Sequence, residues 1–157
     1  MNASVDRVHA VLAQFGRGDR IRVLDESTHT AQQAADAMGV AVAQIAKSIV
    51  FQAAETRRAV VVITRGDRRV QEKVLATRIE EPVERAHPDW VREKTGYPIG
   101  GVSPLGHNKS VVLLLDQALW DYDLLYAAAG HPQTVFSVSP DELRQMTDAP
   151  VVDGVSR

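Results

Sequence analysis

The 157-residue sequence has no cysteine, almost no net charge and no long apolar run. Without cysteine, a disulfide framework, a thiolate nucleophile and a zinc–thiolate site are all excluded. A formal net charge of −2 argues against coating long stretches of nucleic acid, although a few local cations would suffice to grip one RNA end. No apolar run approaches the ~18 residues of a membrane helix. Residues 1–6 lack the basic and apolar regions of a signal peptide, so we expect a cytoplasmic protein with neither membrane nor DNA as a partner.

Lysine is also scarce, and one lysine has an unusual place. Arginine outnumbers lysine 14 to 4, yet Lys47 stands inside the apolar, strand-like run at residues 45–51. In a regular strand Lys47 shares a face with the apolar residues two positions away, while Ser48 faces the other way. An ammonium among apolar side chains loses hydration unless something pairs with it. Two interpretations stay open: a side chain that extends its amine to water, or a partly desolvated ammonium that binds an anion.

A glycine-rich segment follows about fifty residues later. Residues 95–106 contain four glycines and two prolines, which is incompatible with regular structure and too long for a simple turn. Gly100 and Gly101 would let the backbone approach a ligand closely, and consecutive N–H groups can stabilise an oxyanion. A plain connecting loop is the alternative. Together, Lys47 and this loop suggest an ammonium facing exposed backbone amides, which is an arrangement suited to anions.

Two other kinds of catalytic site find less support in the sequence. A serine nucleophile at Ser103 is an alternative, but residues 101–105 lack the last glycine of a nucleophile elbow and do not connect a strand to a helix. None of the five histidines has metal-ligand spacing with another histidine or a carboxylate. We therefore expect neither a metal nor an organic cofactor.

The hydrophobic periodicity predicts one α/β domain over residues 1–157. Its sheet should be curved, mixed and mostly antiparallel, flanked by helices, with residues 59–64 as a central strand because they are apolar on both faces. Helices are expected at 4–15, 30–39, 69–78, 88–96 and from 139, and strands at 21–25, 45–51, 59–64, 82–86, 111–115, 123–128 and 134–138. From residue 149 we expect only a short tail.

An ordered set of motifs resembles the YbaK/ProX proteins. The set comprises the lysine-bearing strand, the G-x-x-x-P segment from Gly100 to Pro104, an Ala-Gly turn at Gly130 before a strand, and Ser-Pro-Asp-Glu-Leu at 139–143. The resemblance covers about Val5 to Val152. Proteins of this family are freestanding relatives of the editing domain of bacterial prolyl-tRNA synthetase, and they hydrolyse mischarged aminoacyl-tRNA.

The resemblance implies roles for particular residues. Lys47 matches the lysine that the family requires for activity, and Gly100 and Gly101 match the loop that holds the scissile carbonyl. The residues implied in substrate binding are Thr30, Ser48, Val102, Ser103, Pro104, Gly130 and His131. Two of these have simpler alternatives, since Thr30 also suits a helix N-cap and His131 also suits a solvent-facing turn.

The implied function is trans-editing: hydrolysis of the ester between a small mischarged amino acid and a tRNA, most of all proline tRNA. The arginine-rich segments 57–58 and 65–69 would contact the acceptor stem, and prolyl-tRNA synthetase is a candidate partner. The amino acid stays open, because the lysine is followed by Ser48 where the alanine-editing branch has asparagine and the cysteine-editing branch threonine. A non-catalytic module that binds an RNA end or a synthetase is the rival; it would need Lys47 but no oxyanion loop.

Overall fold

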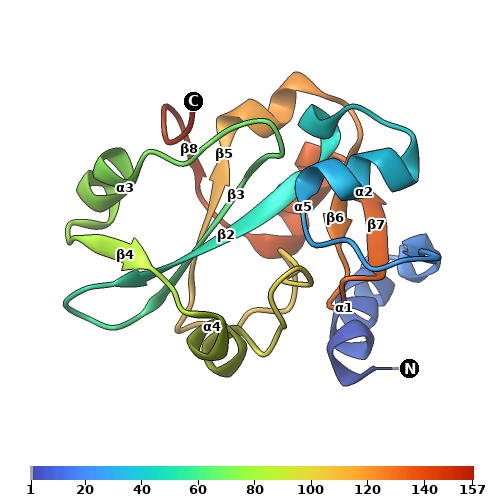
Figure 1. Cartoon of the computed structure of the whole chain (residues 1–157), viewed down its shortest axis with the longest axis horizontal. Coiled ribbons are helices and arrows are strands. Elements are labelled where there is room, and N and C mark those ends of the chain that lie inside the picture. Colours follow the sequence, from blue (N-terminus) through green and yellow to red (C-terminus); the bar gives the residue numbers. More distant parts are fainter. Residues whose placement is uncertain (1) are drawn as a thin grey trace.

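The computed structural model describes residues 2–157 as two β-sheets with helices packed around them (Figure 1). The five-stranded sheet has the order β4-β2-β3-β5-β8, and the three-stranded sheet has the order β1-β7-β6. The strands are β1 (Ile21–Val23), β2 (Ala46–Ala53), β3 (Ala59–Arg65), β4 (Val83–Arg85), β5 (Val112–Asp116), β6 (Leu125–Ala128), β7 (Thr134–Val138) and β8 (Val151–Val152). The helices are α1 (Ala3–Gln14), α2 (Ala31–Met38), α3 (Glu72–Ile79), α4 (Pro88–Thr95) and α5 (Pro140–Thr147).

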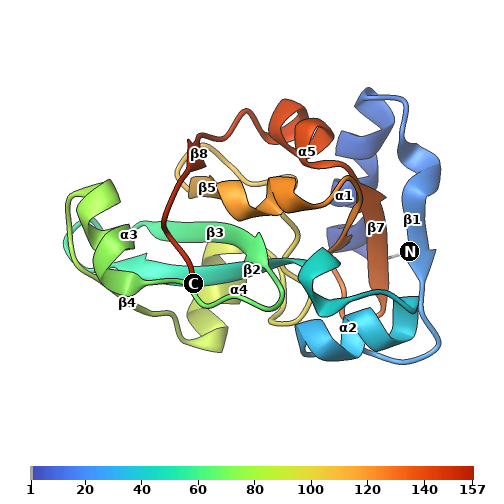
Figure 2. The same cartoon turned by 90° about the horizontal axis from the view of Figure 1, so that it is seen from above.

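The predicted fold class is confirmed, with the strands divided between two sheets. The three-stranded sheet is antiparallel throughout, whereas β3 and β5 pair in parallel within the larger sheet. Residues 60–63 of β3 are fully buried, as expected for a strand with apolar residues on both faces. Figure 2 shows α5 and α2 on opposite sides of the molecule.

Strand β2 connects the two sheets and leaves part of one edge open. In Figure 1 it crosses the molecule from the smaller sheet towards β4. It pairs with β3 over residues 46–52, but with β4 only over residues 51–53. Just before β2, Ile45 forms a single parallel bridge with Tyr126 of β6. Within the described residues, the other edge of β2 therefore has no strand partner over 46–50, the stretch that contains Lys47.

Local capping signals set both ends of α2 as predicted. The Thr30 side chain accepts a hydrogen bond from the Gln33 amide, and Gly39 ends α2 in the left-handed region. The reciprocal half of the expected capping box is displaced by one residue, because the Gln33 side chain accepts from the His29 amide. No helix within residues 2–157 combines the length and apolarity needed to cross a membrane.

Two sequence-based expectations about packing are wrong. The predicted tail after residue 149 contains β8, which pairs with β5, and the tail residues Val155 and Ser156 are buried. A strand of two residues is too short to show a periodicity. The helix expected at 69–78 was to bury one face formed by Val70 and Val74, with Leu75 as a further candidate. It begins at Glu72 and so excludes Val70. Within α3 the buried side chain is Leu75, while Val74 is 37% exposed.

An ionic contact ties α5 to the segment after α1. Glu142 accepts hydrogen bonds from Arg20 Nη1 at 2.7 Å and Arg17 Nε at 2.9 Å, and it completes a capping box with Ser139. The hydrogen bond from Arg20, with further help from the Ser139 amide and Arg17, lowers the pKa of Glu142 to about 2.

Glu142→Gln should therefore destabilise the protein in a pH-dependent way. A depressed carboxylate pKa contributes stability that is complete above the ordinary value near 4.5 and is lost as the pH falls towards 2. At one pKa unit per ~1.4 kcal/mol, the contribution at pH 7 is at most about 3 kcal/mol. Urea unfolding at pH 7 and at pH 2.5 measures it. A loss of the same size at both pH values would contradict a contribution from the carboxylate charge, since glutamine can still complete the capping box.

Candidate active site

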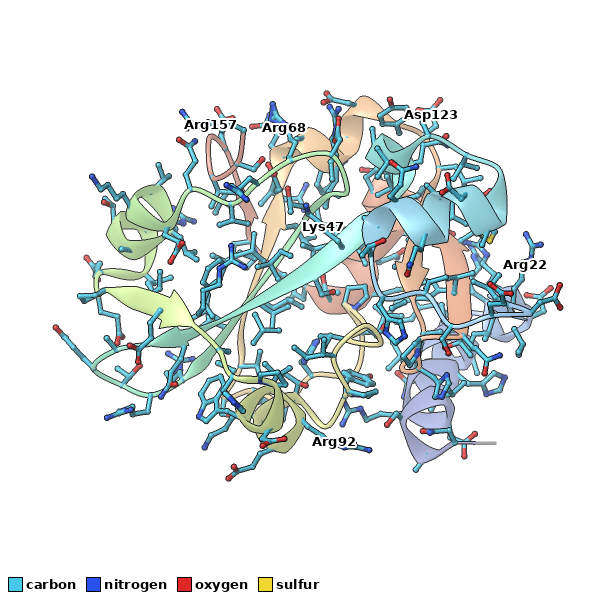
Figure 3. All side chains as sticks on the ribbon, viewed as in Figure 1. Arg22, Lys47, Arg68, Arg92, Asp123 and Arg157 are labelled. Carbon is cyan, nitrogen blue, oxygen red and sulfur yellow. The ribbon has the colours of Figure 1, made fainter. Side chains whose placement is uncertain are left out.

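A cavity of about 660 Å³ lies between the open edge of β2, the start of α2 and the glycine-rich segment. This volume is within the range of small-molecule sites. Five of the residues singled out in the sequence line it: Thr30, Lys47, Ser48, Gly100 and Val102. Figure 3 shows Lys47 on β2, in the central part of this face. The residues that form the cavity are far apart in the sequence, so the fold brings them together.

Lys47 reaches the cavity with its charge only partly compensated. Its Nζ donates a hydrogen bond to the Gly66 carbonyl oxygen at 3.3 Å, and the side chain is half-buried. An ammonium has three donors, and this is its one hydrogen bond within residues 2–157. Burial lowers the pKa of Lys47; the Asp67 carboxylate opposes this, and the cations Arg69 and Arg85 reinforce it. The ammonium can therefore gain from an additional acceptor or anion.

The Ser48 hydroxyl is a second unsatisfied group at the cavity. Its Oγ is buried and has no hydrogen-bond partner in the part of the chain that the structure describes. A buried hydroxyl without a partner is costly, and such groups in folded proteins usually have an explanation. Because Ser48 lines the cavity, a bound ligand with a donor or acceptor at this point would satisfy it.

The glycine-rich segment contributes Ile99, Gly100 and Val102 to the lining of the cavity. Gly100 has φ +85°, a conformation that favours glycine, and it lies beside His29 and the Thr28 carbonyl. Within residues 2–157, the amides of Gly100 and Val102 have no hydrogen-bond acceptor, and both residues line the cavity. Unpaired amides of this kind can stabilise negative charge on a ligand.

Gly101 differs from our expectation. Its N–H already donates to the Pro98 carbonyl oxygen at 2.9 Å, closing a turn, so it does not point at an oxyanion in this arrangement. A Cβ added at Gly101 would lie 2.8 Å from the His131 backbone. Gly101 is therefore required by close packing of two loops, and its proximity to His131 keeps the loop against the β6–β7 turn.

Ser103 and Pro104 lie beneath the cavity surface and do not line it. Ser103 is fully buried, and its Oγ accepts a hydrogen bond from the Leu105 amide at 3.2 Å. The His107 ring nitrogen contacts the Ser103 carbonyl oxygen, not its hydroxyl. This geometry suits a loop-shaping residue and gives no support to Ser103 as a nucleophile.

Gly130 and His131 form the turn between β6 and β7, outside the cavity lining. Gly130 has φ +100° and packs against the Ser4 carbonyl oxygen. The His131 Nδ1 accepts from the Gln133 amide at 3.0 Å. Thr30, by contrast, both lines the cavity and caps α2, so its two predicted uses are compatible.

Several lining residues were not anticipated from the sequence. Tyr126 lies at the junction of the two sheets, and Arg85 comes from the short strand β4. Neither carries a local motif, so only the fold reveals them. Within residues 2–157, no group of three or more metal-ligating side chains lies close enough together to hold an ion.

A buried tyrosine fixes the shape of the glycine-rich segment. Tyr97 is fully buried and donates from its hydroxyl to the Leu105 carbonyl oxygen at 2.7 Å. Arg7 of α1 stacks over the Tyr97 ring at 3.9 Å, donates to its hydroxyl and bonds the Thr95 carbonyl oxygen at 2.6 Å. The two ends of the segment are thus joined to each other and to α1.

His107 holds the same segment from its far side. Its Nε2 lies 2.6 Å from the Ser103 carbonyl oxygen, and its ring packs edge-on against Tyr97. Burial lowers the pKa of His107, which keeps the ring neutral at physiological pH. A neutral imidazole can donate from Nε2 to that carbonyl.

Tyr97→Phe should loosen the segment without disturbing the sheets. The change leaves the buried Leu105 carbonyl and one Arg7 donor unsatisfied, a cost of about 1–3 kcal/mol. We expect that loss in urea unfolding. Amide hydrogen exchange across residues 98–106 should be faster in the variant than in the wild type, while exchange across β3 should stay unchanged. Tyr122→Phe is a matched control, since Tyr122 has no hydrogen bond from its hydroxyl within residues 2–157. Unchanged exchange at 98–106 would contradict the assigned role of Tyr97.

Comparison with known proteins places the chain in a family. The model of the aminoacyl-tRNA editing domain matches residues 25–146, which include the cavity and both of its signature segments. The chain belongs to this family of YbaK/ProX-like editing domains.

Individual relatives agree with this assignment. The uncharacterised protein YwhH of Bacillus subtilis is 27% identical over 144 residues, covering 92% of this chain and 91% of YwhH. A solved structure described as a candidate trans-editing enzyme for prolyl-tRNA synthetase superposes with a TM-score of 0.86 at 38% identity, covering 98% of this chain and 97% of its own. The proline–tRNA ligase of Limosilactobacillus fermentum is 33% identical over 96 residues, which are 58% of this chain and 17% of the ligase.

Proposed function

We propose that this protein is an aminoacyl-tRNA deacylase that edits in trans, removing a small mischarged amino acid from proline tRNA. The observation that supports it most is that one cavity is lined by residues carrying four groups with unused hydrogen-bonding capacity. These are the Lys47 ammonium, the buried Ser48 hydroxyl and the unpaired amides of Gly100 and Val102. In an editing-domain chain, these groups fit the terminal aminoacyl-adenosine of a tRNA.

In this proposal the substrate extends across the cavity from β2 to the glycine-rich segment. Lys47 holds the terminal nucleotide, because its ammonium retains unused donors beside the open edge of β2. The Ser48 hydroxyl forms a hydrogen bond with a polar group of the substrate. The amides of Gly100 and Val102 hold the carbonyl oxygen of the ester.

The proposed reaction is hydrolysis of the ester bond. Water attacks the carbonyl carbon, and the amides of Gly100 and Val102 stabilise the charge that develops on its oxygen. The bond to the ribose oxygen then breaks, releasing the free amino acid and a tRNA with its terminal hydroxyl restored. Asp67 is a poor base here, because its hydrogen bonds from Arg65 lower its pKa. The neighbouring hydroxyl of the substrate's own ribose relays the proton.

Lys47→Met should abolish deacylation while preserving the fold. Methionine keeps the unbranched, apolar part of the side chain, and removing a half-buried ammonium lifts a desolvation cost. We expect turnover to fall at least 100-fold with an unchanged or higher thermal midpoint. Lys73→Met on the exposed surface of α3 is the control and should retain activity. Activity within threefold of wild type, worth less than ~1 kcal/mol of barrier, would rule out the role of Lys47.

The cavity should select substrates by size. A hydrophobic pocket distinguishes one methylene by only ~1–3 kcal/mol, so alanine, serine and cysteine esters should be cleaved with overlapping efficiency. Exclusion of a rigid ring by steric clash can be stronger. Ester loss from proline tRNA charged separately with each amino acid measures this. We expect prolyl-tRNA to survive conditions that clear at least one small amino acid.

The same assay decides between this function and a non-catalytic RNA-end module. A module would bind tRNA without ester loss, and hydrolysis of prolyl-tRNA as fast as every mischarged form would exclude editing. We place the reaction in the cytoplasm, where charged tRNA is used, with prolyl-tRNA synthetase as a candidate partner.

A further inference from the structure

A second hollow, of about 400 Å³, adjoins the cavity at Lys47. The two hollows adjoin each other, because five residues line both: Lys47, Ile49, Gly66, Asp67 and Arg85. The second hollow differs sharply in character. Five cationic side chains line it, drawn from β2, β4, the segment after β3 and the last residue of the chain: Lys47, Arg68, Arg69, Arg85 and Arg157.

The side chains that line this basic hollow carry an excess of positive charge. Asp67 is the acidic side chain of its lining, and both of its oxygens already accept hydrogen bonds from Arg65, at 3.0 and 2.6 Å. Within residues 2–157, the guanidinium groups of Arg68, Arg69 and Arg85 take part in no ion pair or hydrogen bond. Arg69 and Arg85 also lower the pKa of Lys47, as neighbouring like charges do.

Such a cluster is unusual in a chain whose formal net charge is −2. Like charges held together repel one another, and an anion bound among them relieves that repulsion. Arginine side chains match phosphate oxygens with two parallel hydrogen bonds. The hollow also includes the apolar side chains of Phe51 and Val70, both nearly buried, which limit water beneath the cations. The chemistry therefore favours a phosphate-bearing ligand.

We propose that the basic hollow holds an internucleotide phosphate of the single-stranded 3′ end of the tRNA, while the terminal nucleoside occupies the adjoining cavity. This inference rests on the proposed function and names the part of the substrate that the cavity alone does not bind. A ligand that fills both hollows must be anionic at one end and largely uncharged at the other. An aminoacyl-nucleoside joined to a phosphodiester has that pattern.

Two substrates of different length provide the test. One is an aminoacyl-adenosine, which has no phosphate, and the other is the aminoacyl trinucleotide C-C-A, which has internucleotide phosphates. The variant is the double substitution Arg68→Gln/Arg69→Gln, since these residues line only the basic hollow. The control is Arg22→Gln/Arg92→Gln, whose arginines lie elsewhere on the surface (Figure 3).

We expect the wild type and the control to prefer the trinucleotide. In the double variant, the ratio of kcat/KM for trinucleotide to that for aminoacyl-adenosine should fall at least tenfold. The salt dependence of trinucleotide binding should weaken by about 0.7 in log–log slope for each phosphate that the variant no longer neutralises. An unchanged ratio, whether both kcat/KM values stay the same or fall equally, would overturn the proposal.

A binding measurement separates this inference from the proposed function. Fluorescence anisotropy of a labelled, uncharged C-C-A trinucleotide should show weaker binding to the double variant than to the control, even if the wild type cleaves neither ester. Equal binding to both would overturn the proposal. Inorganic phosphate should compete only at much higher concentration than the trinucleotide. Competition at equal concentration would identify a site for free phosphate and contradict a nucleic-acid subsite.

Discussion

The pairing of β2 with β3 fixes the backbone that carries Lys47 and Ser48, and the site depends on it. This antiparallel pairing runs along nearly the whole of β2, while β4 reaches only its last residues and β6 touches only its start. The stretch between these two ends keeps one edge free. Lys47 and Ser48 lie on that stretch, so a backbone fixed by one long pairing presents an ammonium and a hydroxyl at an edge that other strands do not cover.

The opposite wall of the cavity has no regular structure, and side-chain contacts replace it. The stacked Arg7 and Tyr97 side chains, together with His107, hold the glycine-rich segment from both ends. Rigid support of this kind matters because amides stabilise a developing charge only if they are already oriented towards it. The amides of Gly100 and Val102 are among those that this support leaves without an acceptor.

The sequence predicted features that depend on local chemistry. The lysine inside an apolar strand, the buried central strand and the cap at Thr30 were all recognisable, because each follows from a few neighbouring residues. Features that depend on distant contacts were missed. Strand β8 is too short to show a pattern, and nothing adjacent to Gly101 reveals that its amide bonds to Pro98.

Some features of the candidate site could likewise be predicted from the sequence, and others depend on the fold. Its two signature segments were visible as departures from ordinary composition, and the family resemblance rested on them. The basic hollow was only partly visible: the run at residues 65–69 stood out, whereas Arg85 joins it through the pairing of β4 with β2. The buried, unpartnered state of the Ser48 hydroxyl is a property of packing, and sequence alone does not contain it.

The central claim is that the cavity between β2 and the glycine-rich segment holds an aminoacyl-adenosine. The most direct measurement is an NMR titration of the ¹⁵N-labelled protein with an analogue in which a stable amide replaces the ester. The account predicts the largest amide shifts at Ser48, Gly100 and Val102, with smaller changes at Gly101, whose N–H is already bonded. Shifts confined to other surfaces, or no saturable shift at millimolar analogue, would contradict it.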